Sequence, residues 1–443
     1  MVSRKRRGSQ ADGTRHDVGH GHSHDDDRPF RERLDALASR RVLFGMIVAI
    51  VVATALGLVM LWPEDTEPVT TLEGESFFGE RVEADVFAVV TGDCTYASKP
   101  GQFTCDTAKF RVTTGSPKGD RDTLELPVGA GGPRLEAGDH VILYYGFDAP
   151  AGSQYQFADF QRTSPMLALA GIFCVVVVAF GRWRGFFAIV GVAISMIVLV
   201  GFILPALLNG ESPIWVALVG TSTVALLALY LAHGLSERTS VAVLGTVSSL
   251  LLTCLLGVVF VHLTHLTGLD GEEVGFLQAF GGMLDFSGLL LAGMVIGALG
   301  VLDHVTVTQV SAIWELREAK PQATALELYQ AGVRIGRDHI ASTVNTLVLA
   351  YAGASLPLLL LFRIAGQRLG DVLTSESIAI EIIRALVGSI GLVASVPITT
   401  GLAALVVTRE RTAPDSRDER SEPPDRSTPT TAPSWDDFGP DPR

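Results

Sequence analysis

The chain is poor in charge. Only 18% of its 443 residues are Asp, Glu, Lys or Arg, whereas 48% are apolar. A soluble protein needs a polar surface to close its core, so this balance argues against an ordinary soluble fold. Eight apolar runs recur along the chain, most of them about 18 to 25 residues long, which matches a hydrocarbon core of ~30 Å. The sequence therefore predicts a polytopic, all-α membrane protein.

Motifs of the common enzyme classes are absent. The sequence has no nucleotide P-loop, no Ser nucleophile elbow, no HExxH and no paired catalytic carboxylates. It also lacks a basic patch with interleaved aromatic residues, so nucleic-acid binding has no support. We expect that the protein is not an enzyme, and we predict no cofactor.

Cysteine is scarce, with four residues in two pairs. Cys174 and Cys254 lie inside apolar runs, where a thiol ordinarily acts as a small apolar side chain. Cys94 and Cys105 lie in a polar insert, and they are candidates for a disulfide if that insert faces an oxidising compartment. Free thiols or a metal pair are the alternatives.

The apolar runs predict eight membrane spans, near residues 42–62, 165–181, 185–208, 213–233, 241–263, 286–306, 341–362 and 378–407. Lys and Arg concentrate in the connections on one side and in both tails, so the positive-inside rule places both termini in the cytoplasm. A cleaved signal peptide is the alternative for the first run, but its n-region of about forty residues is too long. The tails, 1–41 and 409–443, are expected to be disordered.

One sizeable polar insert, residues 64–163, falls outside the cytoplasm in this topology. Clusters of Gly, Pro and Asp separate short β-type runs within it. The predicted strands are 82–90, 102–112, 123–128, 140–147 and 154–160. Five short strands in one small domain favour an antiparallel barrel or sandwich, with an OB-like barrel as the specific expectation.

Ionisable residues at the membrane boundary supply the main functional candidates. Asp303 and His304 end the sixth run, where charged groups are costly unless they are paired, hydrated or functional. The two could relay protons, since the pKa of His lies near neutrality. The alternatives are that they cap the helix end, meet lipid headgroups, or pair with Arg337.

The amphipathic segment 311–340 follows. It is too polar to span and is expected to lie on the cytoplasmic interface, broken near Pro321. It runs through Arg337 and Asp338 into the seventh span, where Asn345 needs a partner on another helix. A hydrogen bond inside the bundle is the expected role of Asn345, and a transport path is the alternative.

Two further groups of polar residues have a structural alternative. Glu381 and Arg384 stand three residues apart near the outer end of the eighth span, so they are expected to pair with each other. The N-terminal tract His20, His22 and His24 could bind Zn²⁺ or Ni²⁺ weakly, but a disordered tail rarely enforces a ligand geometry. No other metal site is predicted.

Five segments of the membrane part stand out together. They are Gly297-Ala-Leu-Gly-Val-Leu-Asp303, Ile335-Gly-Arg337-Asp338, Asn345-Thr-Leu-Val-Leu-Ala-Tyr351, Leu356-Pro-Leu-Leu-Leu-Leu-Phe362 and Glu381-Ile-Ile-Arg384-Ala-Leu-Val-Gly388-Ser-Ile-Gly391. On these residues the chain from about residue 165 resembles the YibE/YibF family of bacterial integral membrane proteins. The resemblance implies a multi-pass protein of the bacterial plasma membrane with a transport-related role. His304 departs from the pattern, which has a small apolar residue there.

A weaker similarity concerns layout. A helix carrying a membrane Asp, an amphipathic segment and a span with Leu-Pro-Leu follow in the order found in the SecD/SecF and related RND-type exporters. Layout alone does not establish function.

Three functions follow as hypotheses. The first is a transporter or export-assisting protein with Asp303 as the carboxylate that couples an ion or a proton. The second is a scaffold or accessory subunit whose outer domain binds a protein or envelope partner, and the third is a membrane-embedded enzyme. The predicted partners are the lipid bilayer and a membrane or extracytoplasmic protein, with no nucleic acid. The sequence does not specify the substrate or the oligomeric state.

Overall fold

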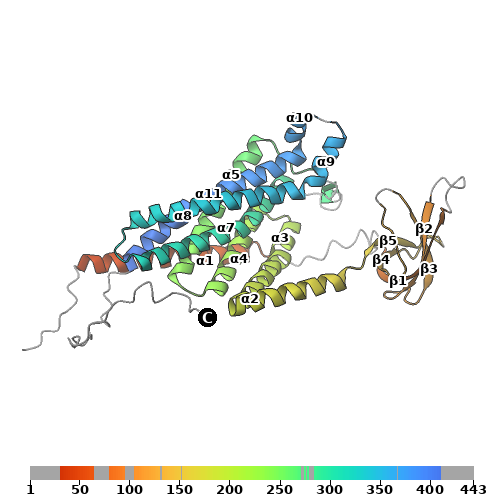
Figure 1. Ribbon diagram of the computed structural model, residues 1–443, viewed down its shortest axis with the longest axis horizontal. Helices are drawn as coiled ribbons and strands as arrows, with labels where there is room; N and C mark the ends of the chain where they lie inside the picture. Colours follow the sequence, from red (N-terminus) through yellow and green to blue (C-terminus); the bar gives the residue numbers. More distant parts are fainter. Residues whose placement is uncertain are drawn as a thin grey trace, which may run out of the picture.

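A computed structural model describes residues 30–63, 79–94, 104–129, 132–150, 152–270, 274–275, 277–278, 284–366 and 368–410. These residues form a helical bundle and a five-stranded sheet, and α2 connects the two (Figure 1). The N-terminal His tract and the predicted C-terminal tail from residue 411 lie outside the described residues.

The bundle consists of α1 Phe30–Met60, α2 Thr163–Val198, a π-helical turn Leu199–Ile203, α3 Leu204–Leu208, α4 Pro213–His233, α5 Glu237–Leu263, α7 Phe286–Ala319, α8 Ala325–Ala354, α9 Leu356–Ile364, α10 Leu369–Thr374 and α11 Glu376–Glu410. Six helical segments are long and apolar enough to cross a membrane, and α8 with α9 makes a seventh if the bent pair is one span. The bend is 56°, and Pro357 in the first turn of α9 explains it, because its ring cannot continue the preceding helix. An all-α membrane part is thus supported, with a smaller count than eight.

The difference in count lies in one segment. Thr163–Leu208 is counted as a single 46-residue apolar segment, yet its helical length of about 69 Å is more than twice the ~30 Å of a hydrocarbon core. Arg182 interrupts it with φ 50° and ψ −132°. A Cβ on Gly185 would collide with the carbonyl oxygen of Val177, so these two residues lie against each other. In a straight helix, residues eight positions apart would be separated by about 12 Å. The chain therefore doubles back at Arg182 into a helical hairpin.

Two boundaries differ from the expectation. α1 begins at Phe30, so the last part of segment 1–41 is helical rather than disordered, in keeping with the helix formers Arg, Glu, Leu and Ala that fill it. The amphipathic segment 311–340 is not a separate interfacial helix, because its first part continues α7 and its second part opens α8. The break does fall beside Pro321, as expected.

The connection between α7 and α8 explains that arrangement. The Arg317 guanidinium is buried and its Nη1 donates to the carbonyl oxygen of Ala323 at 2.6 Å. Thr324 and Glu327 form a capping box that starts α8, which satisfies backbone donors that a helix start otherwise leaves free. Leu328 and Ile313 belong to one buried apolar cluster, so the two parts of the amphipathic segment pack on each other.

The centre of the bundle is formed by α5, α7 and α11, which all pack on one another, with α4 beside α7 and α8 on α11. Two hydrogen bonds link buried polar side chains across these helices: Thr246 to Thr306 at 2.7 Å, and Thr400 Oγ1 to Gln309 Oε1 at 3.1 Å. Gly245 allows Thr399 of α11 to approach the α5 backbone closely. Small residues and polar contacts are the usual means of helix association in lipid, where burial of apolar surface gives no drive.

The outer insert forms an antiparallel sheet of five strands. They are β1 Glu80–Asp93, β2 Thr104–Val112, β3 Arg121–Pro127, β4 His140–Tyr145 and β5 Tyr155–Phe160. Their order is β3-β2-β1-β4-β5. The edge strands β3 and β5 approach each other, so the sheet curls around the apolar core that includes Val82, Phe110 and Leu143.

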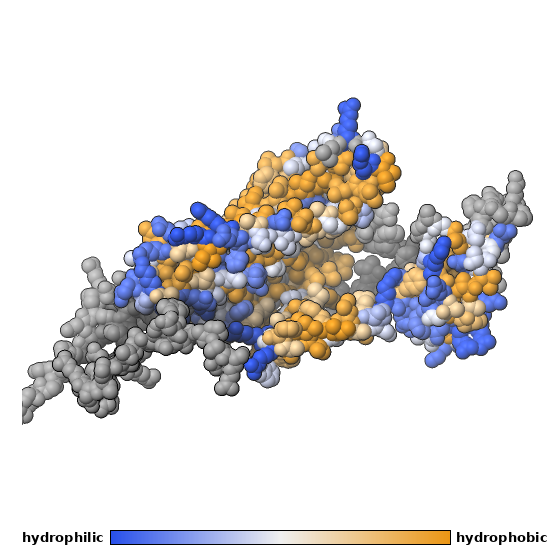
Figure 2. Space-filling model, in the orientation of Figure 1, coloured by the Kyte–Doolittle hydropathy of each residue, from blue (hydrophilic) through white to orange (hydrophobic). Residues whose placement is uncertain are grey.

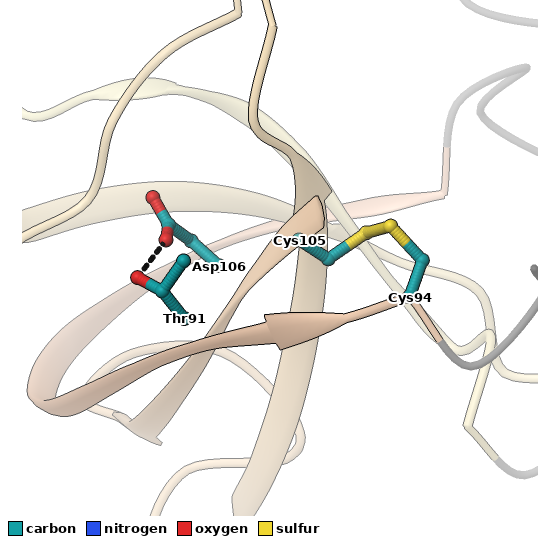
Figure 3. Close-up of a disulfide and its surroundings, with 4 residues drawn as sticks. All are labelled: Thr91, Cys94, Cys105 and Asp106. Carbon is teal, nitrogen blue, oxygen red and sulfur yellow. Dashed lines mark hydrogen bonds between the residues drawn. A yellow bond between two sulfur atoms is a disulfide. The ribbon is translucent and has the colours of Figure 1, made fainter. Parts of the chain in front are cut away.

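The disulfide Cys94–Cys105 closes the end of the β1–β2 hairpin (Figure 3). Beside it, Thr91 Oγ1 donates to Asp106 Oδ1 at 2.6 Å across the same two strands. The buried Asp106 carboxylate therefore has a hydrogen-bond donor, as a buried charge requires. Cys174 and Cys254 of the bundle remain free thiols.

Candidate functional site

A cavity of about 440 Å³ lies between the second half of α2, α4 and α7. Its size falls in the range of small-molecule sites, about 300 to 1,000 Å³. Most of its lining is apolar, and the polar side chains that reach it are Ser195, Thr221, His233 and Asp303. Figure 2 shows the molecular surface hollowed beside α2, with apolar residues around the hollow.

Asp303 is the distinctive group in this cavity. Its Oδ1 atom is buried and has no hydrogen-bond partner among the described residues. A buried carboxylate oxygen without a partner is costly when the group is charged, so Asp303 is a candidate functional residue.

The two hydroxyl groups of the lining donate within their own helices. Ser195 Oγ donates to the carbonyl oxygen of Gly191 at 3.0 Å, and Thr221 Oγ1 donates to that of Ala217 at 2.6 Å. Such bonds to the preceding turn are common for these residue types. Their donor protons are therefore not aimed at Asp303, so the carboxylate faces the cavity without a donor from the lining hydroxyls.

His233 is a member of the site that the sequence reading did not identify. It is the last residue of α4, is exposed, and lines the cavity together with Asp303. His233 and His304 are the titratable groups whose charge acts on Asp303. A His at the end of an apolar run, just before Gly234, was the available signal. Its distance of 70 positions from Asp303 hid the relation, because only the packing of α4 on α7 brings the two helices together.

The other candidates around Asp303 lie elsewhere. His304 is exposed on α7, and its carbonyl oxygen accepts from Thr308 Oγ1 at 2.9 Å. Arg337 and Asp338 are exposed on α8, and no ion pair joins Arg337 to Asp303 within the described part of the chain. The proposed pairing of Asp303 with Arg337 is thus not seen.

Asn345 is exposed on α8, and its side chain makes no hydrogen bond to any described residue. The expected bond inside the bundle is therefore missing. The reason is geometric: α8 packs on α11 and α7 through the face that carries Leu328, Gly332 and Gly336, and Asn345 stands on another face of the helix.

Glu381 and Arg384 form the expected pair, with Arg384 Nη1 donating to Glu381 Oε1 at 2.7 Å. Both side chains are about a quarter exposed, at 24% and 27%. The guanidinium also lies over the ring of Tyr351, 6.0 Å from its centroid, a distance that allows a cation–π contact. Gly297 of α7 leaves room for the Tyr351 hydroxyl. This cluster joins α7, α8 and α11.

Within the described residues, no three His, Cys, Asp or Glu side chains converge as metal ligands would. The chain is a polytopic α-helical membrane protein. Its helices are long enough to cross a membrane, buried polar side chains bond between them, and a cavity that contains Asp303 lies between α2, α4 and α7.

Residues 169–409 match the family model described as YibE/F-like protein, and the chain belongs to that family. The matched region runs from α2 to α11 and includes every cavity residue. Comparison with curated proteins and with solved structures gives no match, so the layout similarity to the SecD/SecF exporters gains no support.

Proposed function

We propose that the protein is a transporter or export-assisting protein, rather than an enzyme, in which Asp303 couples the movement of an ion or a proton. The observation that carries the proposal is the buried Asp303 Oδ1 atom, which faces a cavity between membrane helices without a hydrogen-bond partner among the described residues. The charge of a carboxylate in that setting is neutralised by a proton or a bound cation, and the buried charge is energetically costly when neither is present. Binding and release at Asp303 therefore change the charge of the bundle interior.

Proton movement in proteoliposomes tests this function. A pH gradient is imposed across vesicles that contain purified protein, and an internal pH-sensitive dye reports its decay. Wild-type protein should speed the decay, and Asp303→Asn should return it to the rate of protein-free vesicles. Asp338→Asn is the matched control, because this carboxyl group is exposed on α8 and does not line the cavity. Equal rates for wild type and Asp303→Asn would overturn the proposal.

The topology that accompanies this function has eight crossings and both termini in the cytoplasm of the bacterial plasma membrane. The hairpin at Arg182 supports the count, since each of its arms is a separate apolar helix. A single new cysteine at Trp183, in a Cys174→Ser, Cys254→Ser background, tests it. A membrane-impermeant maleimide should label this position only after permeabilisation, and labelling in intact cells would contradict the eight-span arrangement.

The outer domain favours a second candidate function, a scaffold that binds an extracytoplasmic protein. Phe87 and Val90 of β1 are 52% and 59% exposed, and apolar side chains on a domain surface commonly mark contact sites. In this case deletion of residues 66–162 should remove the cellular function while Asp303→Asn preserves it. The transport function predicts that Asp303→Asn alone abolishes it.

The strand order supports an OB-like barrel for that domain. Joining the two edge strands of β3-β2-β1-β4-β5 closes the sheet in the cyclic order 1-2-3-5-4, which is that of an OB barrel. An experimental structure of the outer domain with β3 hydrogen-bonded to β5 would establish closure, and two separate edges would exclude it.

A further inference from the structure

The cavity beside Asp303 has a composition that selects its ligand. Apolar residues dominate the lining, and Phe187, Met196 and Leu299 are among the large ones. One carboxylate, without a hydrogen-bond partner among the described residues, faces the same space. An apolar cavity with a few placed polar groups is typical of sites for small organic molecules.

Inorganic divalent cations do not fit this arrangement. Ca²⁺ takes about six to eight oxygen ligands, and Mg²⁺ requires a near-octahedral set. Asp303 is the only carboxylate among the lining residues, and the hydroxyl groups of Ser195 and Thr221 donate to backbone carbonyls of their own helices. A hard cation would therefore lose its water shell without adequate replacement.

An organic cation fits the cavity better than a divalent metal ion does. Its charge is spread or shielded by carbon, so it is weakly hydrated and loses little on leaving water, and its apolar body matches the walls. A single carboxylate then neutralises the one positive charge. Charge pairing between apolar walls is stronger than at an exposed surface.

We propose that the cavity between α2, α4 and α7 binds a monovalent organic cation with an apolar body, its charge placed against Asp303 in exchange for a proton. This inference rests on the proposed function and specifies its substrate class. Cation and proton compete for one carboxylate: when the cation binds, the Asp303 O–H bond breaks and the proton leaves to water, and the reverse occurs on release. No oxidant or other co-reactant is required.

The titratable groups near Asp303 come from two helices. On α4 the cavity is lined by His233, and on α7 His304 is adjacent to Asp303, whereas the lining residues of α2 carry no titratable side chain. Because cation and proton compete for the Asp303 carboxylate, binding of the cation is expected to strengthen as the pH rises.

Radiolabelled tetraphenylphosphonium is the probe. Purified protein in detergent micelles is brought to equilibrium by dialysis at mildly alkaline pH, with protein-free micelles as the background. Wild-type protein should bind one cation per chain. Asp303→Asn should weaken binding by at least about tenfold, since it leaves the cation without its counter-charge. Asp303→Glu keeps the charge and should retain binding, and Asp338→Asn should behave as wild type.

Two comparisons locate the site and isolate the charge. Val192→Trp fills part of the cavity from a residue that is 56% exposed, so it should reduce binding without burial of a new side chain in the core. Triphenylphosphine oxide has a similar apolar body without a net charge and should not displace the cation. Displacement by this neutral compound, or equal affinity of Asp303→Asn and wild type, would overturn the inference.

Failure of the inference and failure of the function are separable. If wild-type protein moves protons through Asp303 but does not bind tetraphenylphosphonium, the coupling role stands and the substrate class is wrong. If Asp303→Asn moves protons as wild type does, the coupling role itself fails, whatever the binding result.

Discussion

The disulfide between Cys94 and Cys105 makes a contribution to the stability of the outer domain that can be calculated. A cross-link removes conformational entropy from the unfolded chain, and the effect grows slowly with the length of the closed loop. For the sequence separation of 11, the chain-entropy relation gives about 3 kcal/mol. Such a loss is a large part of the stability of any small domain.

Reduction is the cleanest perturbation because it breaks the cross-link and leaves both side chains in place. Full-length protein in detergent micelles, with or without reductant, is exposed to increasing urea and then to a brief pulse of protease. The surviving outer domain is quantified at each concentration. With a urea dependence of about 1 to 1.5 kcal/mol per molar for a domain of this size, the unfolding midpoint should fall by about 2 to 3 M on reduction.

The double variant Cys94→Ala, Cys105→Ala is the control, since reductant has no bond to break in it. Both cysteines are buried, so the variant should be no more stable than reduced wild type, because it also loses the volume of two sulfur atoms. An unchanged wild-type midpoint on reduction, with the disulfide verified by mass spectrometry, would refute the entropic reasoning.

Three further predictions concern packing and charge. Gly185→Ala places a methyl group against a backbone carbonyl in the α2 hairpin, so we expect the free energy of unfolding to fall by about 1 to 3 kcal/mol in a denaturing-detergent titration. Gly181→Ala is the control, because a Cβ there meets nothing within 4 Å. Arg384→Gln removes the ionic partner of Glu381 at a half-buried position and should lower the free energy of unfolding by up to about 3 kcal/mol. Adding Glu381→Gln in the same chain should restore most of this loss, and additive losses in the double variant would contradict the prediction. Burial, followed by the charge of a nearby carboxylate, raises the pKa of Tyr155 to about 12 from the usual 10.0. The folded state therefore favours the protonated phenol, and the stability of the outer domain should fall as pH rises from 10 to 12. The absorbance difference between wild type and Tyr155→Phe checks this, and a phenolate that forms near pH 10 would contradict it.

Several elements could be predicted because their signals are local. The five strands appear where alternation and turn residues indicated them, and His140 and Phe160 bound β4 and β5 as expected. The Glu381–Arg384 pair was also predictable, since residues three apart on a helix face each other whatever the helix packs against.

Other elements depend on distant contacts and could not be predicted. The segment 311–340 reads as an interfacial helix by its amphipathic pattern, but the pattern is equally satisfied by two helices that pack on each other. The contact of Ile313 with Gly332 across the α7–α8 turn decides between them. The exposed position of Asn345 likewise depends on which face of α8 meets α11.

What the sequence determined by itself is the class of protein and its division into parts. Apolar runs of membrane length specify helices, because no other structure of one short segment satisfies its own backbone in lipid. Alternating, glycine-punctuated segments specify the β domain. The tertiary structure alone brought His233 to Asp303 and enclosed a cavity between α2, α4 and α7. Helix periodicity assigns residues to faces, but only the packing of one helix on another decides which faces meet.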